Sequence, residues 1–154
     1  MPTVGKPAPD FELINQNGKT VRLRDFRGKK VVMFAYPAAG TSGCTTQACG
    51  FRDQFPRFQQ NNIVVLGISP DKPEDQLKWK NAENLPYDLL CDQDHHVLQE
   101  WGGWGEKTNY GKIYEGVIRS HWIIDENGVL IDEKLNVKPV ESVEKAAAAL
   151  VGEA

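Results

Sequence analysis

The chain has 154 residues, of which 40% are hydrophobic and 25% are charged, and its formal net charge is −3. This length and composition predict a single globular domain, residues 1–154, with a core of its own. The acidic balance excludes the usual nucleic-acid-binding classes, which need a basic stripe, and no apolar run approaches the roughly 20 residues of a membrane span.

Two short apolar runs, residues 11–14 and 20–23, flank Asn17-Gly18, a dipeptide typical of tight turns. They predict an antiparallel hairpin at the start of the domain. The following run, residues 31–36, is apolar throughout and predicts a buried strand.

A helix is predicted after this strand, from about residue 44 to residue 60. Phe51, Phe55 and Phe58 recur at spacings of four and three, so they share one face of that helix. We expect this face to pack against the core, and we expect Asn61-Asn62 to end the helix.

The rest of the chain continues to alternate strands and helices. In order, we predict a strand at 63–69, a helix from Pro73 to about Asn81 opened by Asp71, a short strand at 89–91, a short helix capped by Asp94, a loop at 102–105, strands at 117–125 and 129–131, and a helix at 140–151. This order predicts an α/β domain with parallel crossovers and an antiparallel hairpin near its end.

Cys44 lies at the junction between the predicted strand 31–36 and the predicted helix. The first turn of a helix has unpaired N–H groups and a partial positive charge, which favour an anion. An ordinary thiol has a pKa of about 8.5, and its thiolate is the nucleophilic form. Cys44 is therefore the candidate reactive thiol, although a cysteine taken alone is often only a small buried apolar residue.

Cys49 follows five residues later, inside the same predicted helix. An ideal helix would hold the two Cα atoms roughly 8.6 Å apart on different faces, whereas a disulfide needs less than about 7 Å. A bond between these two cysteines would therefore require the first turns of the helix to unwind. The alternatives are that Cys91 or an external thiol reacts with Cys44, but the position of Cys91 after an apolar run favours a buried strand cysteine.

The loop Pro37-x-x-x-Thr41-x-x-Cys44 and the run Gly43-Cys44-Thr45-Thr46-Gln47-Ala48-Cys49-Gly50-Phe51-Arg52-Asp53 resemble the active site of peroxiredoxins. The subfamily they resemble is peroxiredoxin Q, also called bacterioferritin comigratory protein. Segments at 7–11, 104–107 and 119–125 are similar to family segments in family order, so the resemblance covers nearly the whole chain. It implies a thioredoxin-like α/β fold with an N-terminal β-hairpin extension and a central mixed sheet flanked by helices. It also implies thiol-dependent reduction of hydrogen peroxide and organic hydroperoxides.

The resemblance further implies a role for each of five residues. Cys44 would be the peroxidatic cysteine, oxidised to a sulfenic acid. Cys49 would be the resolving cysteine of an atypical 2-Cys enzyme, whose intramolecular disulfide is reduced by thioredoxin or a similar dithiol. Arg119, expected within the strand 117–125, would stabilise the thiolate. Thr41 would hydrogen-bond thiolate and peroxide, and Pro37 would shape and shield the pocket.

The resemblance to this family also implies a monomer that needs no cofactor and no metal. Residues 1–7 contain no apolar signal core and three cysteines are too few for a disulfide scaffold, so we expect a reducing, cytoplasmic setting. The loop differs from the family at Ala38 and Ser42, where Lys and Pro are frequent. These differences remove a cation and loosen the loop, and they make Ser42 the expected N-cap of the helix.

Two other classes of function stay open at this point. A thioredoxin-type disulfide oxidoreductase is disfavoured because it uses Cys-x-x-Cys, and four residues separate Cys44 from Cys49. A redox-sensing or metal-binding module could combine the cysteines with His95, although helix geometry would hold Cys44 and Cys49 apart. A further polar cluster is interpreted as a helix cap and solvated face; it comprises Asp92, Asp94, His95 and His96.

Overall fold

The structure is a computed structural model that describes residues 2–152, apart from the side chain of Asn109. Its central strands are β1 (Glu12–Asn15), β2 (Thr20–Arg22), β3 (Lys30–Ala35), β4 (Ile63–Ser69), β5 (Asp88–Cys91), β8 (Ser120–Ile124) and β9 (Leu130–Lys134). They form one mixed sheet in the order β2-β1-β5-β4-β3-β8-β9. The ends of the expected domain, residue 1 and residues 153–154, lie outside the described residues.

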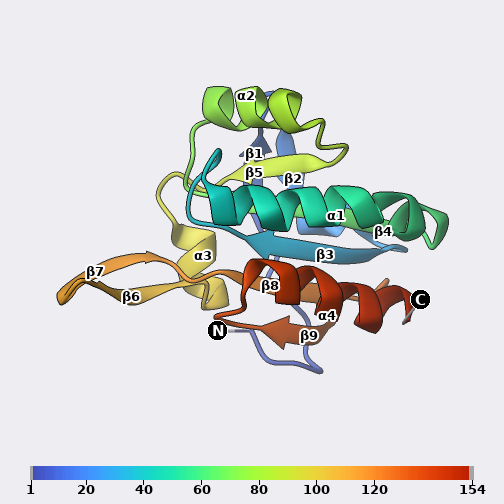
Figure 1. Cartoon of the computed structure of the whole chain (residues 1–154). Coiled ribbons are helices and arrows are strands. Elements are labelled where there is room, and N and C mark those ends of the chain that lie inside the picture. Colours follow the sequence, from blue (N-terminus) through green and yellow to red (C-terminus); the bar gives the residue numbers. More distant parts are fainter. Residues whose placement is uncertain (1, 153–154) are drawn as a thin grey trace.

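The helices are α1 (Ser42–Gln60), α2 (Pro73–Glu83), α3 (His96–Trp101) and α4 (Pro139–Val151), with a short 3-10 turn at Leu23–Phe26. Helices α1 and α4 lie side by side (Figure 1), and their buried residues share one apolar cluster with Trp79 of α2. Trp101 of α3 belongs to a second apolar cluster. The expected α/β arrangement, a mixed sheet flanked by helices, is confirmed. Within residues 2–152, no helix combines the length and apolar character needed to cross a bilayer.

The centre of the sheet is formed by the apolar runs that the sequence identifies. Strand β3 pairs in parallel with β4 and antiparallel with β8, and Val32 and Phe34 of β3 are fully buried. The stripe of three phenylalanines on α1 packs as expected, with Phe51 and Phe58 fully buried and Phe55 partly so. This packing fixes α1 against the sheet and so fixes the loop that joins β3 to α1.

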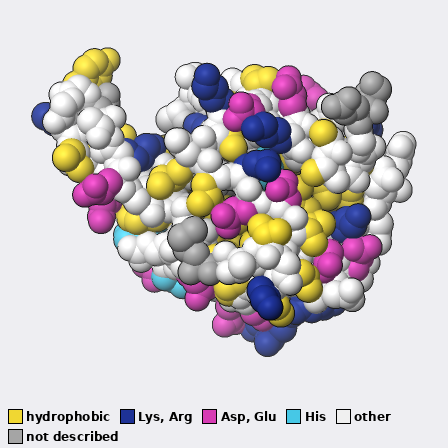
Figure 2. All heavy atoms as spheres, turned by 90° about the horizontal axis from the view of Figure 1, so that it is seen from below, with side chains coloured by type: hydrophobic (Ala, Val, Ile, Leu, Met, Phe, Trp, Pro, Cys, Tyr) yellow, Lys and Arg dark blue, Asp and Glu magenta, His cyan; other side chains and the backbone are white. Residues whose placement is uncertain are grey.

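An arm of two antiparallel strands, β6 (Trp104–Asn109) and β7 (Lys112–Val117), replaces the loop predicted at 102–105. It stands away from the body of the molecule, with hydrophobic side chains at its tip (Figure 2). Tyr110 is 98% exposed there. The arm was missed because its sequence lacks the apolar alternation that marks a half-buried strand.

The single strand predicted at 117–125 is also wrong. Strand β7 ends at Val117 and β8 begins at Ser120, so Arg119 lies in a two-residue link and not within a strand. The link leaves the ladder because Ile118 N–H donates to the carbonyl of Gly103 and the Arg119 carbonyl accepts from Val137 N–H. Apolar residues on both sides of the link concealed the break in the sequence.

Two expected helix caps are corrected. Ser42 is the first residue of α1, and its N-cap is Thr41, which makes no side-chain capping bond. Asp71 does not open α2, whose N-cap is Lys72. The Asp71 carboxylate instead accepts hydrogen bonds from Ala39 N–H at 2.8 Å and Ser69 Oγ at 2.7 Å. Asp71 therefore holds the loop before α1, while Pro73 at the start of α2 has no N–H that needs a cap.

Candidate active site

Cys44 is the third residue of α1 and is only 1% exposed. The loop that leads to it begins at Tyr36, a buried residue whose backbone N–H donates to Ile68 and whose hydroxyl donates to Gln76 at 2.6 Å. With the bond from Ala39 to Asp71, these contacts fix the loop at its start and at its middle. The thiol therefore has a defined position at the start of a helix, as the sequence predicts.

Arg119 is the cation beside this thiol. Its Nη2 donates to Cys44 Sγ at 3.4 Å and its Nη1 donates to Gln47 Oε1 at 2.6 Å. Gly43 leaves room for the guanidinium, because a methyl group there would stand 3.2 Å from Arg119 Nη2. Among the described residues no carboxylate forms an ion pair with Arg119. Its positive charge is therefore available to a thiolate at Cys44.

A cleft of about 520 Å³ borders the guanidinium of Arg119. Pro37 lines it together with Ile118, Val137 and Pro139, and the rest of the lining is polar, from residues 106–108 of the arm and from Asn136 and Lys138; Cys44 and Thr41 are not part of the lining. Thr41 is exposed at the loop end, and its hydroxyl donates to the Ala38 carbonyl at 2.8 Å. With its hydrogen engaged there, Thr41 does not make the expected hydrogen bond to Cys44, and its oxygen remains free to accept one.

Cys49 points to a different neighbour from Cys44. It is half-buried, and its Sγ donates to Glu83 Oε2 at 3.4 Å. Two effects raise the pKa of the Cys49 thiol: partial burial, which is the larger, and this hydrogen bond. Both cysteines are free thiols inside one continuous helix. Their different partners agree with the expectation that the helix holds the two thiols on different faces.

Cys91 ends strand β5 and is 4% exposed, so the prediction of a buried strand cysteine is confirmed. Burial raises the pKa of this thiol to about 12. It pairs in the sheet with Ser69 and Ile14. A thiol held in this way is a poor nucleophile at neutral pH.

Three buried polar residues that the sequence did not mark stand behind Arg119. Gln47, Ser142 and His121 are fully buried and are connected by hydrogen bonds. One signal was available: Gln47 lies three residues after Cys44 and so shares its helix face. Burial lowers the pKa of His121 to about 4. The negative charge of Asp132 has a smaller effect that raises this pKa, and the positive charges of Lys134 and Lys145 lower it slightly further.

The burial of His121 predicts that acid weakens the fold. An unfolded histidine has a pKa of about 6.5, whereas that of folded His121 is about 4. Because the unfolded chain binds the proton first, the contribution of His121 to stability is complete above about pH 6.5 and is lost as the pH falls toward about 4. At about 1.4 kcal/mol per pH unit, the loss is roughly 3 kcal/mol.

His121→Asn removes the titrating ring and should remove this loss. The measurement is the free energy of unfolding in urea for both proteins at about pH 7 and about pH 4.5. We expect the wild type to lose more of its free energy of unfolding than His121→Asn between the two pH values, so that any advantage of the wild type at about pH 7 narrows or reverses at about pH 4.5. Titration of Asp92 and His96 is common to both proteins and cancels in the comparison. If the difference in the free energy of unfolding between the two proteins does not change with pH, the lowered pKa of His121 is contradicted.

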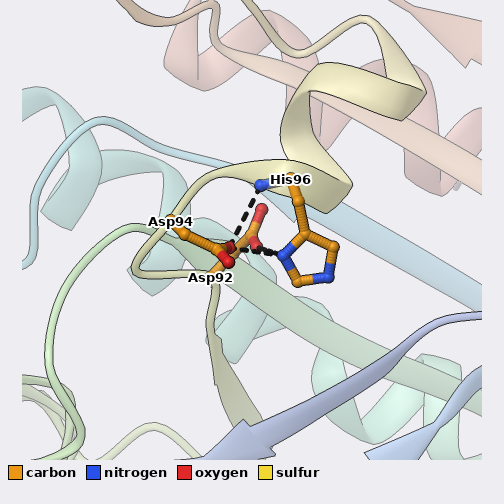
Figure 3. Close-up of side chains that lie close together, drawn as sticks. All are labelled: Asp92, Asp94 and His96. Atoms are coloured by element: carbon orange, nitrogen blue, oxygen red, sulfur yellow. Dashed lines mark hydrogen bonds and ion pairs between the residues drawn. The ribbon is translucent and has the colours of Figure 1, made fainter.

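A second polar cluster joins Asp92, Asp94 and His96 (Figure 3), whose possible ligand atoms lie within 4.8 Å of one another. Asp92 is fully buried and accepts hydrogen bonds from Leu98 N–H at 2.8 Å and Val97 N–H at 3.4 Å. The His96 ring contacts both carboxylates. The predicted cap Asp94 is therefore corrected: the N-cap of α3 is His95, which makes no side-chain capping bond, and the carboxylate that accepts from the second and third N–H groups of the helix is the buried Asp92. His95 stacks instead on Trp104.

The sequence profile of the AhpC/TSA family matches residues 4–133. Peroxiredoxin Bcp of Bacillus subtilis is 43% identical over 143 residues, which are 93% of this chain and 91% of that protein. Peroxiredoxin Bcp of Escherichia coli is 45% identical over 124 residues, 80% of each chain. The solved structure of Xanthomonas campestris peroxiredoxin Q superposes with a TM-score of 0.86 at 26% identity, covering 91% of this chain and 89% of that one. These similarities confirm the expected thioredoxin-like fold.

Proposed function

The chain belongs to the AhpC/TSA family and is a thiol-dependent peroxidase of the peroxiredoxin type, and on that premise we propose that Cys44 is its peroxidatic cysteine. The observation that carries this proposal is the hydrogen bond from Arg119 Nη2 to Cys44 Sγ at 3.4 Å, at the start of α1. Both the helix end and the guanidinium favour the thiolate over the thiol.

In the proposed reaction the Cys44 thiolate attacks one oxygen of the hydroperoxide. An S–O bond forms, the O–O bond breaks, and sulfur is oxidised to sulfenic acid while the second oxygen leaves as hydroxide or alkoxide and takes a proton from water. Arg119 donates hydrogen bonds to the charge as it moves from sulfur to oxygen. Thr41 accepts the peroxide hydrogen, and Pro37 forms a wall of the cleft without offering a competing N–H.

Cys49 is the proposed resolving cysteine. Its thiol attacks the sulfenic acid of Cys44, which forms the S–S bond and releases water. Its hydrogen bond to Glu83 keeps it protonated while α1 is intact, so it becomes reactive only when the helix opens. The high pKa and burial of Cys91 make it a poorer candidate.

We propose that the whole chain acts as a monomeric single domain and that thioredoxin or a similar dithiol reduces the Cys44–Cys49 disulfide. Hydrogen peroxide and organic hydroperoxides are both proposed substrates. The cleft beside Arg119 supports the second class, because its volume of about 520 Å³ and its apolar wall can hold an alkyl group. No cofactor or metal enters these steps.

Peptide mapping by mass spectrometry after one equivalent of hydrogen peroxide tests the assignment. We expect a Cys44–Cys49 disulfide and peroxide consumption sustained by a thioredoxin system. Cys91→Ser is the matched control and should turn over within about twofold of the wild type, since Cys91 is buried in strand β5 and takes part in none of the proposed steps. Cys44→Ser should consume no peroxide. A Cys44–Cys91 bond would transfer the resolving role, and an active Cys44→Ser variant would overturn the peroxidatic assignment.

A further inference from the structure

A row of buried polar side chains leads away from the guanidinium of Arg119. Arg119 Nη1 donates to Gln47 Oε1 at 2.6 Å, and Gln47 Nε2 donates to Ser142 Oγ at 3.1 Å. Ser142 Oγ lies 2.7 Å from His121 Nδ1. We call Gln47, Ser142 and His121 the polar row. Its members come from α1, α4 and β8, and all three are fully buried.

The direction of the first two bonds in the polar row follows from Arg119. A guanidinium only donates, so Gln47 must turn its carbonyl oxygen toward Arg119 and its amide nitrogen toward Ser142. The Ser142 oxygen accepts that bond, which leaves its own hydrogen to donate. In the proposed arrangement this hydrogen is donated to Nδ1 of a neutral His121, which stands 2.7 Å away. A neutral ring in this tautomer carries its hydrogen on Nε2.

Close packing of two helices brings the polar row together. Gly50 of α1 faces Val143 of α4, where a methyl group on Gly50 would stand 2.7 Å from Val143 Cγ2. The missing side chain lets α4 approach α1 and places Ser142 against Gln47, one turn before Gly50. His121 reaches Ser142 from the neighbouring strand, which pairs with β3 at Phe34.

We propose that Ser142 and His121 are positioning residues that orient Gln47, and through it hold Arg119 against the sulfur of Cys44. Arg119 needs such support because it lies in the link between β7 and β8, and a long side chain there loses rotamer freedom when it is held in place. Gln47 is uncharged, so it orients the guanidinium without neutralising the charge that the thiolate uses. This inference rests on the roles proposed above for Cys44 and Arg119.

Ser142→Ala is the direct test, because it removes the acceptor of Gln47 Nε2 and keeps the size of the side chain nearly unchanged. We expect the reduced variant to react with hydrogen peroxide roughly 10-fold more slowly, as is typical when a buried partner of a functional group is removed. The pH profile of Cys44 alkylation should also move toward higher pH. Leu150→Ala is the matched control: it shortens a partly buried side chain at the other end of α4 and should lower thermal stability without changing the reaction rate or the alkylation profile.

Two variants of His121 test the far end of the polar row. His121→Asn can place a carbonyl oxygen where Nδ1 stands and should retain the wild-type rate within about twofold, whereas His121→Leu offers no acceptor and should behave like Ser142→Ala. If Ser142→Ala and His121→Leu lose stability but keep the wild-type rate and alkylation profile, the row is only structural and the proposal is overturned.

A measurement on the unmodified protein covers the case in which these variants do not fold. Nitrogen NMR of the reduced protein should find His121 neutral with its hydrogen on Nε2, and a hydrogen on Nδ1 would overturn the bond direction on which the proposal depends. Arg119→Ala, assayed in parallel, separates the two levels of the argument. If Arg119→Ala is as fast as the wild type, the proposed role of Arg119 fails first; if it is slow while Ser142→Ala is not, only the positioning role fails.

Discussion

Replacing Arg119 with alanine is expected to slow the reaction of the reduced protein with hydrogen peroxide by roughly 10²- to 10³-fold, the usual loss when one preorganised donor is removed from a site where charge develops. Arg119 acts before and during the reaction. Its Nη2, 3.4 Å from Cys44 Sγ, favours the thiolate and then donates to the oxygen that receives the negative charge. Both effects act in the same direction on the second-order rate constant.

Arg119→Lys is the matched variant. Lysine keeps the positive charge, but a single ammonium cannot reproduce the fork that reaches Cys44 and Gln47 together. We therefore expect a rate between those of the wild type and Arg119→Ala. Rapid mixing of reduced protein with peroxide, followed by intrinsic tryptophan fluorescence, measures the rate, and thermal denaturation checks the fold. A wild-type rate for Arg119→Ala would show that Arg119 has only a structural role, and it would contradict the role that the family resemblance implies for this residue.

The elements that the sequence predicts well are those whose local pattern decides their structure. The predicted strand 63–69 has the same first and last residues as β4, and the Asn17-Gly18 turn joins β1 and β2 as expected. The arm 104–117 has no such pattern: its strands pair only with each other, and Ile113 of the arm is 69% exposed. A strand that buries neither face leaves no hydrophobic periodicity in the sequence to detect.

The same distinction holds at the site. Cys44 could be identified because a strand, a loop and a helix start are local features of the sequence. Arg119 could be named only through the family resemblance, and its placement within a strand was wrong because the break after Ile118 is set by long-range backbone bonds to Gly103 and Val137. Ser142 lies 95 residues from Gln47 in the chain. One sequence carries no signal for a hydrogen bond over that separation.

Formation of the Cys44–Cys49 disulfide should unwind the first two turns of α1, so amide hydrogen exchange in residues 42–50 should accelerate by at least about 100-fold on oxidation. An intact helix keeps the two Cα atoms too far apart for a bond. Three contacts must open: Tyr87 Oη donates to the Ala48 carbonyl at 2.6 Å, Trp79 Nε1 to Thr45 Oγ1 at 3.2 Å, and Cys49 Sγ to Glu83.

Oxidation itself weakens the hold on this segment. A hydrogen bond from Arg119 to a thiolate joins two opposite charges, whereas one to a neutral sulfenic acid has only the charge of the guanidinium and is weaker. Phe51 and Phe58 are fully buried and should anchor the remainder of α1, and strands β3 and β4 should keep their protection. Cys49→Ser, oxidised with one equivalent of peroxide, is the control: it forms no internal disulfide and should exchange almost as slowly as the reduced protein. Unchanged exchange in the oxidised wild type would exclude the unwinding.

Ser42→Pro should slow this unwinding and so increase overoxidation of Cys44. Ser42 is the first residue of α1, where the missing N–H of proline costs no helix bond, and Thr41 before it already has the extended backbone (φ −81°, ψ 156°) that proline requires. Proline at a compatible site stabilises the folded segment by about 0.4–1 kcal/mol, so disulfide formation should slow by about 2- to 5-fold. The sulfenic acid then persists longer, and excess peroxide converts more of it to sulfinic acid.

Mass spectrometry at matched peroxide measures the sulfinic fraction, with Ser42→Ala as the control that changes the side chain but not the backbone. Equal sulfinic fractions in Ser42→Pro and Ser42→Ala would show that the opening of α1 does not limit the resolving step.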